Sequence, residues 1–156
     1  MSAATAMAAA VVLGPWLSAV AEPAPRGLAP EADVTHHGHV SLQDGRLGVL
    51  LNSGNRGPSP LTDMTVRLRF SVPLAARQQL PQGCLRSGGR TVLCGTGPLR
   101  VDGEVRRTAV GVRLTGRPAE VVVRVDTVWN GGASDRDRHN DTHEVLTLST
   151  GDPYVF

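Results

Sequence analysis

The sequence predicts an all-β protein, folded as an antiparallel β-sandwich of about seven strands. Apolar and polar residues alternate with a period of two in several segments, which is the pattern of strands with one buried face. Clusters of Gly, Pro and Asn, which favour turns, separate these segments. No helical period appears after residue 21. A closed β-barrel is the structural alternative.

Two predicted strands, residues 47–51 and 64–72, and the loop between them form the centre of this pattern. In the second strand every other residue is apolar: Met64, Val66, Leu68, Phe70 and Val72. Residues 47, 49 and 51 alternate in the same way. The intervening residues 52–60 hold two glycines and two prolines, which favour a turn-rich loop and interrupt a hydrogen-bonded ladder.

The first 21 residues have the features of a secretory signal peptide. An apolar run at residues 8–20 leads to Ala-Val-Ala at 19–21, and these small residues predict cleavage before Glu22. The run is too short and too interrupted to span a bilayer comfortably. No basic residue precedes Arg26, so an uncleaved anchor is the alternative, and it would be the only membrane association.

The remaining chain divides into three parts. Residues 22–37 contain three prolines and little periodicity, which predicts an extended Pro-rich linker. Residues 38–150 form the sandwich domain, and residues 151–156 a short tail. His36, His37 and His39 lie where the linker meets the domain. Adjacent residues of an extended chain point in opposite directions, and no partner lies at zinc-site spacing, so we expect a solvated segment and not a metal site.

The two cysteines are placed symmetrically about a turn signal. Cys84 and Cys94 flank Gly88-Gly89, and a loop of three residues at 88–90 puts them directly opposite each other in a hairpin. A secreted chain with two such cysteines favours a structural disulfide. A redox pair is the alternative, but the spacing is not Cys-x-x-Cys and no helix would lower a thiol pKa.

Three further strands are expected, at residues 105–114, 119–130 and 143–149. The second is the most hydrophobic, and its β-branched residues favour a strand. Trp129, which ends it, is predicted to cap the core, with an exposed ligand platform as the alternative.

Residues 131–141 form the one loop that concentrates polar chemistry. Asp135, Asp137, Asn140 and Asp141 offer the oxygen ligands that calcium prefers. The spacing lacks the glycine and the terminal Glu of an EF-hand, and two intervening arginines would repel a cation. We therefore expect no metal site and assign these side chains to Asx turns, with calcium as the minor alternative.

Charge is nearly balanced, at a formal +2 from 16 basic and 14 acidic residues. All basic residues are arginines, and they are scattered along the strands. Between residues 30 and 150 only Phe70 and Trp129 are aromatic. A nucleic-acid-binding surface would gather basic residues into a stripe with stacking aromatics, so nucleic acid is not expected as a partner.

Several of these segments together resemble a known family. The loop at 52–60 has the form Asn-x-Gly-x-x-Gly-Pro, the strand Thr-Val-Arg-Leu-Arg-Phe follows at 65–70, and Leu-Pro-Gln-Gly stands at 80–83. The pattern is similar to the bacterial immunoglobulin-like (Ig-like) repeat of surface and secreted proteins called "domain of unknown function eleven", and to CARDB-type adhesion modules. The resemblance covers roughly residues 38–150 and implies an Ig-like sandwich with a role at the cell surface.

No arrangement of residues typical of an enzyme is found. There is no Gly-x-Ser-x-Gly, no His-Glu-x-x-His and no glycine-rich phosphate loop before a helix, and no cofactor is implied. We therefore expect a secreted, extracellular, non-catalytic module with an adhesive, scaffolding or accessory role, whose partner is an unidentified protein or cell-wall component.

The sequence leaves two other functions open. A small secreted inhibitor or effector would present a rigid loop, residues 52–60 or 131–141, to a protease or other enzyme. A carbohydrate-binding module is weakened by the low aromatic content, because Trp129 is the one tryptophan in the domain.

Overall fold

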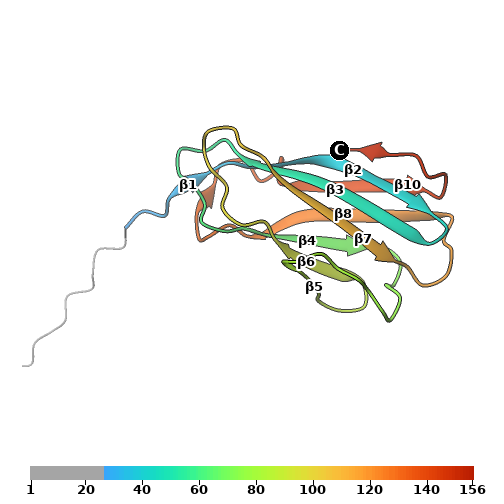
Figure 1. Ribbon diagram of the computed structural model, residues 1–156. Helices are drawn as coiled ribbons and strands as arrows, with labels where there is room; N and C mark the ends of the chain where they lie inside the picture. Colours follow the sequence, from blue (N-terminus) through green and yellow to red (C-terminus); the bar gives the residue numbers. More distant parts are fainter. Residues whose placement is uncertain (1–26) are drawn as a thin grey trace, which may run out of the picture.

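A computed structural model describes residues 27–156 and confirms the antiparallel β-sandwich (Figure 1). Seven strands of five or more residues make up its two main sheets, together with shorter strands. The strands are β1 (Glu31–Ala32), β2 (Val34–Gln43), β3 (Arg46–Asn55), β4 (Thr65–Phe70), β5 (Cys84–Arg86), β6 (Thr91–Gly95), β7 (Arg106–Arg113), β8 (Glu120–Trp129), β9 (Ser134–Asp135), β10 (Thr142–Leu148) and β11 (Tyr154–Val155). Within the described residues, no helix has the length and apolarity needed to cross a membrane.

The two main sheets lie face to face. One has the order β10-β8-β4-β6-β5, and the other has the order β11-β2-β3-β7. Neighbouring strands within both sheets run antiparallel, while β1 and β9 form a small parallel pair at one end of the sandwich. The long strands β2, β3 and β8 each have ten residues and run most of the length of the domain (Figure 1).

The core lies between the inner faces of these sheets. The alternation of apolar and polar residues predicts which residues form this core, because alternate residues of the long strands are buried and their neighbours face outward. The five-stranded sheet contributes Val66, Leu68, Phe70, Val92, Val121, Val123, Val125 and Val145, and the four-stranded sheet contributes Val34, Val40, Leu42, Leu47, Val49, Leu51, Val110 and Val112.

The predicted disulfide is confirmed. Cys84 lies directly opposite Cys94 in the register of β5 and β6, and a disulfide joins them. The turn has the expected three residues, since the backbone N–H of Ser87 donates to the carbonyl of Thr91 at 2.9 Å. The bond closes a hairpin at one edge of the five-stranded sheet.

The predicted domain boundaries need correction at both ends. Residues 31–37, assigned to the linker, form β1 and the first part of β2, because β2 pairs with β3 over its whole length. Val34 is fully buried, so these residues belong to the core. At the other end, Tyr154 and Val155 of the expected tail pair with β2 as β11. The predicted signal peptide, residues 1–21, and the start of the linker lie outside the described residues.

In the last long strand, β10, hydrophobicity does not decide which side chains face the core. Its apolar residues Leu146 and Leu148 are exposed, whereas Val145 and Thr147 face inward. Thr147 has no exposed surface, and its Oγ1 has no hydrogen-bond partner in the described structure. A hydroxyl therefore occupies a core position at the edge of the sheet.

Candidate functional site

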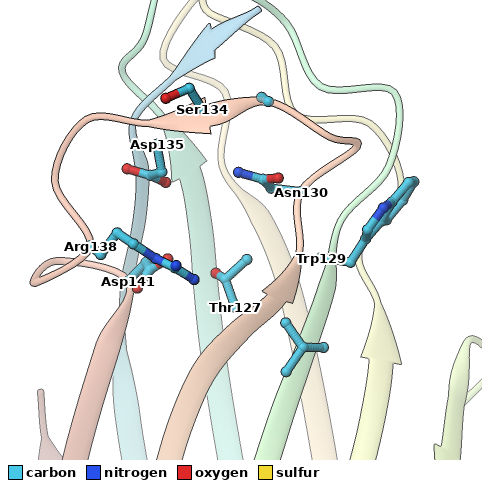
Figure 2. A pocket seen from close by; sticks show the side chains of 9 residues that line it. Thr127, Trp129, Asn130, Ser134, Asp135, Arg138 and Asp141 are labelled. Carbon is cyan, nitrogen blue, oxygen red and sulfur yellow. The ribbon is translucent and has the colours of Figure 1, made fainter. Parts of the chain in front are cut away.

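A pocket of about 300 Å³ opens where β8 ends and the connection to β10 begins (Figure 2). Its walls come from the end of β8 and from the loop at residues 131–141. The lining residues are Thr127, Val128, Trp129, Asn130, Ala133, Ser134, Asp135, Arg138 and Asp141. Of the four polar residues predicted in this loop, Asp135 and Asp141 line the pocket, whereas Asp137 and Asn140 do not.

Backbone pairing holds one side of the pocket in place. β9 pairs in parallel with β1, so the loop is attached to the N-terminal end of the domain. The side chain of Asp135 strengthens this attachment, because its Oδ2 accepts from the backbone N–H of Val34 at 3.1 Å. Its Oδ1 accepts from the N–H of Asp137 at 3.0 Å, which is an Asx turn.

The rest of the loop is organised by similar contacts. Asp137 Oδ1 accepts from the N–H of His139 at 3.0 Å, forming a second Asx turn. The Asn140 amide donates to Asp33 Oδ1 at 2.8 Å and so joins the loop to the segment between β1 and β2. The loop is thus a fixed wall, as the Asx-turn interpretation expects.

The four candidate calcium ligands do not form a cluster of acidic groups. Asp135 and Asp137 use carboxylate oxygens to accept from the backbone, and Asn140 uses its amide group to bind Asp33. In residues 27–156 no three His, Cys, Asp or Glu side chains come together as a set that could hold a metal ion. The observed contacts are those of a hydrogen-bonded loop.

Asp141 is the most buried carboxylate of the pocket, with 2% of its surface exposed. Burial raises the pKa of this carboxyl group, and the nearby charge of Asp135 raises it further. Arg138 and hydrogen bonds from Thr142 and Thr127 act in the opposite direction on the pKa. Figure 2 shows the Arg138 guanidinium beside Asp141, but no ion-pair contact joins the two side chains within the described structure.

Behind the pocket lies a buried polar chain that sequence reasoning missed. His36, expected in a solvated linker, has no exposed surface. Its Nδ1 lies 3.0 Å from Ser53 Oγ, and its Nε2 lies 2.9 Å from Thr127 Oγ1. The Thr127 hydroxyl also donates to Met64 Sδ at 3.8 Å, and Thr127 lines the pocket, so these polar groups reach from the core to the pocket wall.

Burial keeps the His36 ring neutral. The pKa of the ring is lowered from 6.5 to about 4, chiefly by desolvation and also by the charges of His143 and His37, while Asp126 opposes these effects. The group of Ser53, His36 and Asp141 includes the residue types of a hydrolase triad. Ser53, however, has no exposed surface, so no substrate can reach its hydroxyl. This chain therefore connects buried groups and presents no nucleophile.

Trp129 is exposed, and the prediction that it caps the core is wrong. A β-bulge is the reason: Thr65 pairs with Trp129 and Val66 with Thr127, so Val128 has no partner on β4. The extra residue reverses the alternation of inward- and outward-facing side chains along β8, so Trp129 lies on the outward face with 49% of its surface exposed. Figure 2 places its ring at the rim, across the end of β8 from Asp135 and Asp141.

The other candidate loop, residues 52–60, is shorter than expected. Its first four residues belong to β3, and Ser53 and Asn55 are buried. Asn55 organises the remainder, since its Oδ1 accepts from the N–H groups of Asp33 and Gly57 and its Nδ2 donates to the carbonyl of Ser59. This segment is held against β1, since the N–H of Ser59 donates to the carbonyl of Glu31, and it does not line the pocket.

Comparison with known proteins gives little similarity. No protein-family model matches the chain, and no curated protein sequence matches it. Among solved structures, the chain is similar to part of β-glucosidase 3B from Thermotoga neapolitana, a structure in complex with α-D-glucose, with a TM-score of 0.48 and 16% identity. The match covers 80% of the present chain and 17% of the glucosidase chain.

Proposed function

We propose that this chain is a secreted, non-catalytic Ig-like module that acts at the bacterial cell surface as an adhesive or accessory binding unit. Its ligand would be a hydroxyl-rich cell-wall polysaccharide, bound at the pocket beside β8. The proposal is carried by the composition of that pocket: carboxylate, guanidinium and amide groups surround a cavity of about 300 Å³, with the half-exposed ring of Trp129 at its rim.

The charges of the pocket favour an uncharged ligand that both donates and accepts hydrogen bonds. Asp135 offers an acceptor, Arg138 offers donors, and Asn130 offers both. A sugar hydroxyl can donate to a carboxylate and accept from a guanidinium at the same time. An anion would be repelled by the carboxylates of Asp135 and Asp141, and a simple cation would lie next to Arg138.

The surroundings of the pocket support binding without catalysis. Its walls are held by β9, by two Asx turns and by the contact between Asn140 and Asp33, so little order has to be gained on binding. The buried Ser53 hydroxyl cannot act as a nucleophile. The disulfide is compatible with secretion, which the predicted signal peptide also favours.

The test uses the fluorescence of Trp129. Substituting Trp16→Phe in the full chain leaves Trp129 as the one tryptophan. We expect its emission to change on titration with soluble neutral cell-wall polysaccharide. Arg138→Gln should weaken that binding about tenfold through the loss of a charge-assisted hydrogen bond.

Arg69→Gln provides the matched control, because Arg69 is an exposed arginine on β4, outside the pocket. It should leave polysaccharide binding unchanged. Equal weakening by the two arginine substitutions would reject the pocket as the binding site. If no cell-wall polysaccharide binds and the chain instead inhibits a protease, the inhibitor function that the sequence left open replaces this proposal.

A further inference from the structure

A second cavity lies at the opposite end of the sandwich and has a different character. It is an open groove of about 1120 Å³ on the outer face of the four-stranded sheet, around the hairpin that joins β2 to β3. β8 begins near this groove and ends at the first pocket. Its ten residues therefore separate the two cavities by roughly 30 Å, at about 3.3 Å per residue.

Four arginines line the groove: Arg46, Arg77, Arg113 and Arg117. All four are exposed. In the described part of the chain none of their guanidinium groups contacts a carboxylate, whereas five arginines elsewhere each form an ion pair. The one lining carboxylate is Asp44. The groove therefore holds a concentrated positive charge that the protein itself leaves uncompensated.

The floor of the groove has almost no side chains. Ser41, Gly48 and Gly111 form one row across β2, β3 and β7. Gly111 is not required by its backbone, which has no positive φ, and a Cβ at this position would meet no atom within 4 Å. A glycine within a strand weakens the sheet and often marks a place where a ligand approaches closely. Packing thus does not explain the glycine at position 111.

One wall of the groove is built on the edge of β7. The side-chain amide of Gln78 imitates a neighbouring strand: its Oε1 accepts from the N–H of Arg113 at 2.9 Å, and its Nε2 donates to the Arg113 carbonyl at 2.7 Å. Leu74 also forms a β-bridge with Leu114. These contacts fix the segment that carries Arg77 beside the sheet edge, so the wall does not depend on a free loop.

We propose that this groove binds an acidic polysaccharide, with its carboxylate groups paired to the four arginines and its sugar rings lying over the glycine floor. Arginine recognises carboxylates through paired, charge-assisted hydrogen bonds. The groove is too large for a single small anion. Ser41, Gln43 and Gln79 supply groups that hydrogen-bond to sugar hydroxyls. No aromatic side chain lines the groove, so stacking of nucleic-acid bases has no support there.

The test is a titration of the full chain with polygalacturonate, followed by calorimetry. The matched ligand is the fully methyl-esterified polymer, which has the same sugar backbone without the charges. We expect binding of the charged polymer, weakening with added salt, and no binding of the ester. Arg46→Gln/Arg113→Gln should reduce the affinity about tenfold or more.

Two variants separate a built groove from general charge attraction. Arg69→Gln/Arg90→Gln removes the same charge from exposed arginines outside the groove and should change the affinity less than about threefold. Gly111→Leu fills the floor without changing charge, and it should abolish binding while the melting temperature is maintained. Neither variant alters the pocket near Trp129, so this test and that of the proposed function fail independently.

Four outcomes would overturn the proposal. They are equal binding of the methyl ester, equal loss of affinity in the Arg69→Gln/Arg90→Gln variant, unchanged binding by Gly111→Leu, and tighter binding of single-stranded DNA than of polygalacturonate. The first would show that the arginines do not recognise the carboxylates, the next two would show that the groove is not the site, and the fourth would assign it to a different class of polymer.

Discussion

Acidification should destabilise this fold through one buried side chain, His36. The folded protein holds the ring neutral, with its pKa lowered from 6.5 to about 4, chiefly by burial. In the unfolded chain the ring takes up a proton near pH 6.5. The unfolded state therefore binds more protons between these values, and the stabilisation present above pH 6.5 is lost as the pH falls toward 4.

The size of the effect follows from that difference. At about 1.36 kcal/mol per pH unit, a pKa lowered from 6.5 to about 4 corresponds to a loss of about 3 kcal/mol when the titration is complete. Roughly 2 kcal/mol should already be lost at pH 5. Domains of this size are stable by only about 5–15 kcal/mol, so the loss is a large part of the total. Asp141, whose pKa is raised, acts in the opposite direction, because protonation at low pH favours its folded form.

Urea unfolding at pH 7, 6, 5 and 4 measures this directly, on the wild type and on His36→Gln. The variant should be less stable at pH 7, because Ser53 and Thr127 lose part of their hydrogen bonding. Its free energy of unfolding should nevertheless change less with pH than that of the wild type. Carboxylates titrate in both proteins, so the difference between the two curves isolates His36.

A parallel pair of curves between pH 6.5 and 4 would refute the reasoning. If His36→Gln does not fold, the NMR titration of the His36 ring in the wild type provides the same test. Its pKa should lie near 4. A His36 pKa near 6.5 would mean that burial does not hold the ring neutral.

Three further predictions concern stability. Replacing both cysteines, Cys84→Ala/Cys94→Ala, should lower the free energy of unfolding by about 2–3 kcal/mol and leave the sandwich folded, as judged by urea unfolding and circular dichroism. Thr147→Val should raise stability by about 1 kcal/mol in the same assay, because it removes a buried hydroxyl without a partner; a loss would mean that the hydroxyl is bonded. Gly38→Ala should lower the melting temperature sharply, since its Cβ would lie 2.0 Å from the Leu50 carbonyl oxygen, and an unchanged melting temperature would contradict that contact.

The sequence predicted the parts of the fold that depend on local alternation. The burial of Val66, Leu68 and Phe70 follows from their period of two, and the opposition of Cys84 and Cys94 follows from the length of their turn. Both patterns are complete within a single strand or hairpin. They need no knowledge of which strands become neighbours.

Sequence reasoning misses strand β2 although its signal is present. Val34, His36, Val40 and Leu42 share one phase of a period-two pattern. Prolines before this segment and three histidines within it favoured a linker, because an isolated polar residue at a core position is costly. The structure meets that requirement with hydroxyls from β3 and β8. Ser53 and Thr127 lie beside His36 only because the two sheets pack face to face, and this packing cannot be predicted from the local sequence.

The two cavities show the same limit in different forms. At the pocket beside β8, residues 131–141 are close in sequence, so their polar character could be recognised. The bulge that turns Trp129 outward could not be predicted, because it depends on the register of β8 against β4.

The groove has no signal in the local sequence. Its arginines come from three separate segments, around residues 46, 77 and 113–117, and look scattered along the chain. They meet because Ser41 pairs with Gly48 and Gly48 with Gly111, which aligns three strand ends at one face. The scatter of arginines that argued against a nucleic-acid-binding stripe is therefore a property of the chain order, and the register of the sheet brings four of them together in one positive groove.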